Sequence, residues 1–234
     1  MAAILFDAGG VLVWPNWNRV AHALRRHGVI ADATRLAVAD PHARHALDVA
    51  EIVNASTDDS RGIDYFNLVL THAGVPLSDE TDSALDDVCE YHRSSNLWEH
   101  VPDFVIPTLT ALKAQGYRLA VVSNANGTLR ASFARLGLAA FFETMVDSAE
   151  EGLEKPDARL FELALGRVGA AAAEAVHVGD MYHVDIVGAR AAGIRALLVD
   201  EADLKTQVDC PRIRSISELP ALVAGRVPLT SRIS

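Results

Sequence analysis

The sequence predicts an α/β protein in which a parallel sheet carries helices on both faces and a helical segment follows the first strand. Two observations predict the sheet: short apolar runs of β-type residues recur and stop at polar residues, and amphipathic helical patterns lie between them. A third observation predicts the insertion, because residues 14–98 show helical periodicity in place of such runs.

Four apolar runs are predicted as strands, at residues 3–6, 118–122, 175–178 and 195–199. Between the second and the third, helical spacing predicts helices that end near Gly137 and Gly169. Alternation of strands and helices is typical of a parallel sheet covered on both faces.

The helical segment is predicted to form a domain of its own over residues 14–98, and the sheet domain to comprise residues 1–13 and 99–234. Helical patterns end at Gly28 and Gly74, and another follows the acidic start at Asp79. From Gly225 onward the periodicity is weak, and this end is predicted to fray.

Composition excludes several classes of partner. Half of the residues are hydrophobic and 22% are charged, as in ordinary globular proteins. The net charge of -10 disfavours nucleic acid and anionic lipid, which attract basic surfaces. No apolar run approaches the ~20 residues of a membrane span, and the N-terminus lacks a basic leader, so no signal peptide is expected. Cys89 and Cys210 have no metal-ligand spacing, which favours a reducing cytoplasm.

Polar residues follow the predicted strands. Asp7, Ser123 and Asp180 stand at strand ends, and Asp185 follows shortly. Ligands of an open α/β sheet bind at the carboxyl ends of its strands, so one shared site is expected. These residues suit transfer of an anionic group to Asp7, with Mg²⁺ held by Asp180 and Asp185. Taken singly, an acidic residue at a strand end is commonly a turn former or a helix cap.

A cation and an anion cradle are also predicted. The segment "SNANG" begins at Ser123, and its amides with Ser123 and Asn124 are predicted to bind an anion where a strand turns into a helix. The alternative is that Ser123 only caps that helix. Lys155 precedes a predicted helix and is expected to contact the phosphate and the nucleophile, the alternative being a solvated lysine.

Four segments in this order resemble the four motifs of the haloacid dehalogenase superfamily: "ILFDAGGVLV", "LAVVSNANG", "GLEKPDARLF" and "VHVGDMYHVDIVGARAAG". The resemblance runs from Ile4 to about Leu222 and implies a Rossmann-like core with an inserted α-helical cap domain. It also implies magnesium as the cofactor, a small phosphorylated metabolite as the partner, and a monomer or homodimer.

The resemblance assigns roles by position. It implies that Asp7 is the nucleophile, that Ser123 binds phosphate and that Lys155 steadies the intermediate. The metal ligands that it implies are Asp7, the carbonyl of Gly9, Asp180 and Asp185.

Gly9 departs from this pattern. Phosphatases of the superfamily carry an acid there, which protonates the leaving group and then activates water. Such help is worth about 100- to 10,000-fold, so both half-reactions are expected to be slow unless another group substitutes. The candidates are His183 and the inserted cluster His42, Arg44 and His45.

Three functions stay open. A magnesium-dependent phosphatase is favoured, because Asp180 and Asp185 are both retained. A metal-independent dehalogenase-type hydrolase is the alternative, since relatives that cleave carbon–halogen bonds also lack the second acid. A catalytically weak phosphometabolite-binding or interaction protein is the third, because Met181 and Val184 replace polar residues of the last motif.

Two further points concern the inserted segment. A phosphonate hydrolase would need a lysine there, and the first lysine of the chain is Lys113. The sequence does not identify the substrate. Four side chains of the insertion fit a pocket, a core or a surface equally well: Trp17, His45, Arg61 and Tyr65.

Overall fold

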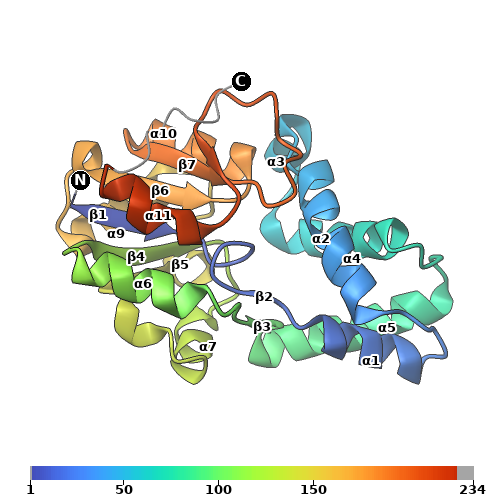
Figure 1. The fold of residues 1–234 in the computed structure, drawn as a ribbon. Coiled ribbons are helices and arrows are strands. Elements are labelled where there is room, and N and C mark those ends of the chain that lie inside the picture. The colour runs from blue at the N-terminus through green and yellow to red at the C-terminus, as the bar shows by residue number, and fades with distance from the viewer. Residues whose placement is uncertain (1, 226–234) are drawn as a thin grey trace. The chain divides into compact units, whose positions relative to one another are not determined.

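The computed structural model describes residues 2–225 and divides them into two compact units (Figure 1). One unit takes the residues up to Trp14 together with those from Val101 onward, and the other is Pro15–His100. The fraying predicted beyond Gly225 lies outside the described residues.

The first unit contains a six-stranded sheet in the order β5-β4-β1-β6-β7-β8, with all neighbours parallel (Figure 1). Its strands are β1 (Ala3–Phe6), β4 (Arg118–Ser123), β5 (Thr144–Asp147), β6 (Ala175–Gly179), β7 (Arg195–Val199) and β8 (Arg212–Ile213). All four residues of β1 are buried, as expected for a parallel strand that is covered on both faces. The predicted α/β class is confirmed.

Helices and short turns connect the strands. The α-helices are α6 (Val105–Ala114), α7 (Leu129–Arg135), α8 (Ser148–Glu151), α9 (Ala158–Val168), α10 (Val187–Ala191) and α11 (Leu219–Val223). Three short 3-10 helices are η1 (Ala139–Phe141), η2 (Ala172–Glu174) and η4 (Ile216–Glu218), and η3 (Tyr182–Ile186) is a π-helix.

Helix α9 illustrates how the sequence sets these elements. It begins at the cap Asp157, whose side chain accepts a hydrogen bond from the Arg159 amide, and ends at Gly169 with a φ of 64°. Its apolar face, with Phe161, packs against Leu5 and the rest of the sheet core. The predicted end at Gly169 is therefore confirmed, because glycine accepts the left-handed backbone that closes the helix.

Within the six-stranded sheet, the sequence prediction missed two strands and shortened two others. Strands β5 and β8 are short edge elements that the apolar pattern did not mark. Strands β4 and β6 each run one residue further than predicted. The reason is the ladder itself, since Ser123 pairs with Asp147 and Gly179 pairs with Leu198.

The second unit is helical, as its periodicity predicted. Its helices are α1 (Trp17–Arg26), α2 (Ala33–Leu47), α3 (Ala50–Ala55), α4 (Asp58–His72) and α5 (Asp79–Ser95). Helix α2 packs on α4, and α1 packs on α5. Where the chain leaves and re-enters the sheet unit, β2 (Trp14–Pro15) and β3 (Trp98–His100) pair with each other.

Three side chains that the sequence left open belong to the interior of the helical unit. Trp17 and Tyr65 are buried with ring centroids 6.3 Å apart, and the Tyr65 hydroxyl donates to Asp40 at 2.8 Å. Arg61 is buried and donates to the Ser56 carbonyl at 3.2 Å. Packing and internal hydrogen bonds therefore account for these positions.

The cluster proposed as a substitute acid lies on α2. Arg44 forms an ion pair with Asp40 at 2.9 Å, the His42 ring lies 5.7 Å from that of His72, and His45 is exposed.

Among residues 2–225, no helix is long and apolar enough to cross a membrane.

Candidate active site

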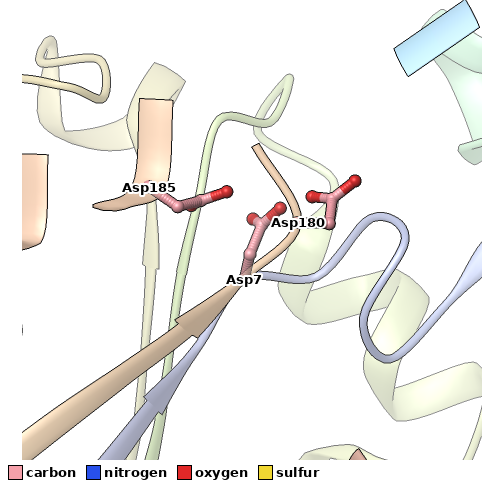
Figure 2. A group of neighbouring side chains, drawn as sticks. All are labelled: Asp7, Asp180 and Asp185. Carbon is pink, nitrogen blue, oxygen red and sulfur yellow. The ribbon is translucent and has the colours of Figure 1, made fainter. Parts of the chain in front are cut away.

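The carboxyl ends of β1 and β6 bring three carboxylates together. Asp7 follows β1, Asp180 follows β6, and Asp185 lies on η3. Figure 2 shows their side chains converging, and one oxygen of each lies within 4.8 Å of the others. The predicted convergence is therefore present in the structure, because parallel strands carry their carboxyl ends to the same edge of a sheet.

Lys155 joins two of these carboxylates. Its Nζ lies 2.7 Å from Oδ1 of Asp7 and 2.7 Å from Oδ1 of Asp185. The side chain is 3% exposed, so the alternative of a solvated lysine is wrong. Burial opposes its charge, but the carboxylates of Asp185 and Asp7 outweigh burial and raise the pKa of Lys155. The ammonium therefore stays charged beside Asp7.

Asn124 fixes the backbone from which Lys155 extends. The Lys155 amide donates to Oδ1 of Asn124 at 2.7 Å, and Nδ2 of Asn124 donates to the Lys155 carbonyl at 3.2 Å. This two-way contact uses one of the two N–H groups of the side-chain amide, so the predicted contact of Asn124 with an anion stays a prediction.

The loop after β4 differs from the predicted anion cradle. Asp147, fully buried at the end of β5, accepts hydrogen bonds from the amides of Gly127 at 3.0 Å and Leu129 at 3.3 Å. The hydroxyl of Ser148 accepts one from the Ala125 amide at 3.0 Å. Oxygens of the chain thus accept from two of the amides that were predicted to hold an anion, those of Ala125 and Gly127. Asp147 was missed, although an acid at a strand end was the available signal.

Ser123 is the last residue of β4 and is buried. It does not cap the following helix, because α7 begins after Thr128, so the capping alternative is wrong. Its hydroxyl lies 3.4 Å from the Asn124 carbonyl, which is longer than a good O–H···O hydrogen bond. The phosphate contact of Ser123 stays a prediction.

The turn between β6 and η3 holds Asp180 and Asp185 in place. The Met181 amide donates to Oδ2 of Asp185 at 3.0 Å, and the buried Lys205 donates from Nζ to the Asp180 carbonyl at 2.9 Å. A Cβ on Gly179 would overlap the Asp185 carboxylate. Glycine at 179 is thus required for Asp185 to approach the strand end.

His177 is a second site residue that sequence reasoning missed. It lies within β6, its side chain is fully buried, and its Nε2 is 3.0 Å from Oδ1 of Asp185. Burial lowers the pKa of His177 despite the hydrogen bond to Asp185. The available signal was an imidazole inside an otherwise apolar strand.

Asp7 and Asp185 share the Lys155 ammonium. Burial, reinforced by the charges of Asp185 and Asp180, raises the pKa of Asp7 to about 7 although Lys155 opposes the shift. Burial also disfavours ionised Asp185, but Lys155 and the hydrogen bond from His177 outweigh it and hold the pKa of Asp185 below its usual range. Three close carboxylates form a hard, oxygen-rich donor set that suits a divalent cation such as Mg²⁺.

The turn after Asp7 carries no acid at the position where one was expected. The Ala8 carbonyl accepts the amides of Leu12 at 2.9 Å and Val13 at 3.0 Å. The left-handed residue of this turn is Gly10, with a φ of 68°. His183, the other candidate for the missing acid, lies on η3 with its ring 5.1 Å from that of Tyr182.

Comparison with known proteins gives consistent matches. A family model described as haloacid dehalogenase-like hydrolase matches residues 1–193. The chain is 40% identical over 126 residues to the glyceraldehyde 3-phosphate phosphatase of Methanothermobacter thermautotrophicus, covering 50% of this chain and 55% of that protein. It is 39% identical over 104 residues to the ribulose-1,5-bisphosphate 5-phosphatase of Halopiger xanaduensis, covering 44% and 43%. The chain thus spans about half the length of these curated relatives.

Among solved structures, a 2-haloacid dehalogenase from Pseudomonas syringae pv. Tomato is 28% identical, with a TM-score of 0.60. The match covers 97% of this chain and 100% of that one. The fold therefore resembles that structure over its whole length.

Proposed function

This chain belongs to the haloacid dehalogenase-like hydrolase family, and we propose that it is a magnesium-dependent phosphatase acting on a small phosphorylated metabolite through an aspartyl-phosphate at Asp7. The contact that carries the proposal is the one from Lys155 Nζ to Oδ1 of Asp7 at 2.7 Å, beside two further carboxylates. A buried carboxylate that is paired with a fixed cation is suited to attack an anionic group.

The reaction has two steps. In the first, an oxygen of Asp7 attacks phosphorus, an O–P bond forms, and the bond from phosphorus to the leaving oxygen breaks. In the second, water attacks the phosphorus of the aspartyl-phosphate, which releases inorganic phosphate and restores Asp7. In this proposal Lys155 offsets the charge of ionised Asp7 before the attack, and the Ser123 hydroxyl donates to a phosphate oxygen.

The proposed metal ligands are Asp7, the carbonyl of Gly9, Asp180 and Asp185. Bound Mg²⁺ would reduce the repulsion between the phosphate and the carboxylates and would polarise the phosphate. The convergence of three carboxylates supports this set. Oδ2 of Asp185, which accepts one amide hydrogen bond, keeps capacity for another partner.

The leaving group receives no proton from position 9 in this scheme. Because Gly9 has no side chain, the leaving oxygen takes its proton from water or a substitute acid, or departs as a stable anion. We therefore propose that substrates with good leaving groups react fastest. The two named phosphatase relatives act on phosphorylated sugars according to their names, which supports a small phosphometabolite as the substrate class.

The dehalogenase-type hydrolase is the second candidate. Two observations favour it, namely Gly9 and the 28% identity to a 2-haloacid dehalogenase over its full length. In that reaction Asp7 would displace halide from carbon and form an ester, which water would cleave. Asp180 and Asp185 favour the phosphatase, because carbon–halogen cleavage by this route requires no divalent cation.

Further proposals concern the setting of the activity. Residues 14–98 act as a cap that excludes water and selects the substrate. Cys89 and Cys210 form no disulfide within the described chain, and we propose a reducing cytoplasmic location. The net charge of -10 supports a protein that binds neither nucleic acid nor anionic membranes. The proposed oligomeric state is a monomer or a homodimer.

One experiment separates the candidates. The purified protein is assayed on an aryl phosphate, an alkyl phosphate and a 2-chlorocarboxylic acid, each with Mg²⁺ or with EDTA. Magnesium-dependent turnover that is fastest on the aryl phosphate is the expected result. Chloride release that persists in EDTA would replace the phosphatase by the dehalogenase. Magnesium binding without turnover of any substrate would support the binding protein.

A further inference from the structure

His177 occupies an unusual place for an imidazole. Strand β6 lies inside the sheet, between β1 and β7, and all of its residues are buried. A parallel strand that is covered on both faces is normally apolar, and a buried polar group costs free energy unless it is hydrogen-bonded. The side chain of His177 must therefore make a favourable interaction at this position that an aliphatic side chain could not make.

The gain is a directed hydrogen bond. Nε2 of His177 lies 3.0 Å from Oδ1 of Asp185. Because an ionised carboxylate only accepts, Nε2 carries the proton in this contact. The contact to Asp185 therefore distinguishes this side chain from an apolar one.

The ring plane is fixed by packing. The Phe161 ring meets it edge to face, with centroids 4.9 Å apart and planes at 86°. Phe161 is itself confined, because a Cβ on Gly188 would lie 2.6 Å from its Cε2. The donor on His177 is therefore held in one direction, toward Asp185.

The same carboxylate oxygen serves Lys155. Oδ1 of Asp185 accepts from His177 at 3.0 Å and from Lys155 Nζ at 2.7 Å, and Lys155 Nζ also lies 2.7 Å from Asp7. A continuous chain of polar contacts thus runs from β6 to the carboxylate after β1. A rotation of the Asp185 side chain would move the oxygen that anchors Lys155.

We propose that His177 is a positioning residue, which fixes the rotamer of Asp185 and, through the shared oxygen, the ammonium of Lys155 beside Asp7. The inference rests on the proposed function, since it assigns His177 a role in that same site. His177 acts through Asp185 and does not itself touch the substrate. Residues that orient metal ligands or catalytic groups in this way commonly contribute about 10- to 100-fold to metal affinity or activity.

Three substitutions separate positioning from packing. Glutamine has as many bonds from Cβ to its amide nitrogen as histidine has to Nε2, so His177→Gln keeps a donor near Asp185. In asparagine the amide nitrogen falls near the position of Nδ1, so His177→Asn is equally polar but displaces the donor. His177→Leu fills the space without a donor. His27→Asn in the helical unit is the matched control, because His27 Nε2 also contacts an aspartate, Asp87, at 3.0 Å.

The experiment measures Mg²⁺ affinity by calorimetric titration of the metal-free protein, and kcat and KM on an aryl phosphate. For His177→Asn and His177→Leu we expect a loss of about 10- to 100-fold in Mg²⁺ affinity and kcat, with KM changed by less than about threefold. His177→Gln should stay within about threefold of the wild type in all three quantities. His27→Asn should match the wild type.

Equal losses in the glutamine and asparagine variants, or no loss in either, would overturn the positioning role. Thermal melting identifies any variant that fails to fold, and if asparagine does so, the comparison of glutamine with leucine decides. A wild-type protein without magnesium-dependent turnover would refute the proposed function, and the Mg²⁺ titration would still test His177.

Discussion

Lys155 lies between Asp7 and Asp185, with its Nζ 2.7 Å from an oxygen of each, and all three side chains are buried. Lys155→Met removes the cation and leaves two carboxylates in the protein interior. We expect activity to be lost and the free energy of unfolding to fall by about 3–5 kcal/mol at neutral pH. Chemical denaturation measures the loss.

The matched control is Lys113→Met. Lys113 is an exposed lysine whose Nζ contacts the Ala140 carbonyl at 3.2 Å, and we expect little change in stability or activity. A Lys155→Met protein as stable and active as the control would contradict the role of the buried pair.

Asp7→Asn tests the nucleophile. The amide has nearly the same shape as the carboxylate but does not attack phosphorus, so turnover of every substrate should be abolished while the circular dichroism spectrum is unchanged. Wild-type rates in the variant would remove Asp7 from the mechanism.

The raised pKa of Asp7 predicts that the stability of the wild-type protein depends on pH. Burial and the neighbouring carboxylates raise the pKa of Asp7 to about 7, above its value of about 3.9 in an unfolded chain. The folded protein therefore binds the proton more tightly, and the stability linked to it is complete below about pH 4 and is lost as the pH rises through about 7.

Asparagine stays neutral at every pH. In EDTA, Asp7→Asn should therefore be more stable than the wild type by a few kcal/mol near pH 8.5, and the difference should shrink toward pH 4. Urea denaturation at both pH values measures it. A wild type that is the more stable protein at the higher pH would show that Lys155 outweighs burial.

Gly9→Asp tests the missing proton shuttle. If only the acid is absent, the alkyl phosphatase rate should rise by on the order of 100-fold, and the aryl rate should rise less because aryl oxygen leaves without protonation. Gly10→Asp is the control. It adds the same acid one residue later, where the φ of 68° disfavours a side chain, and we expect no gain. An unchanged Gly9→Asp rate would point to a substitute acid or to another reaction.

Asp147→Ala tests the loop after β4. Asp147 caps α8 through the Ala149 amide and also accepts the amides of Gly127 and Leu129. Asp157→Ala removes the cap of α9 together with an exposed ion pair to Arg159, and it should cost about 1 kcal/mol. Asp147→Ala should cost clearly more, about 3 kcal/mol, because buried amides lose their acceptor. It should also raise KM, since the loop begins at Ser123. Equal costs in the two variants would exclude this role.

Much of the molecule was predictable from local pattern. Apolar runs and helix-ending glycines predicted the α/β class, the helical insertion and the end of α9 at Gly169. These features depend on residues that are near one another in the chain. The rule that ligands bind at the carboxyl ends of parallel strands predicted that Asp7, Asp180 and Asp185 would meet.

The partners of polar side chains depended on the tertiary structure. Asp147 accepts hydrogen bonds from amides after β4 because the register places it beside Ser123. His177 lies in the strand next to the one that precedes Asp7, because β6 pairs with β1. Asn124 turns to the backbone of Lys155, a residue far from it in the sequence. The sequence by itself determined which chemical groups reach the end of the sheet. Only the packing of distant segments decided which of them contact one another, because hydrogen bonds require positions defined to within a few tenths of an ångström.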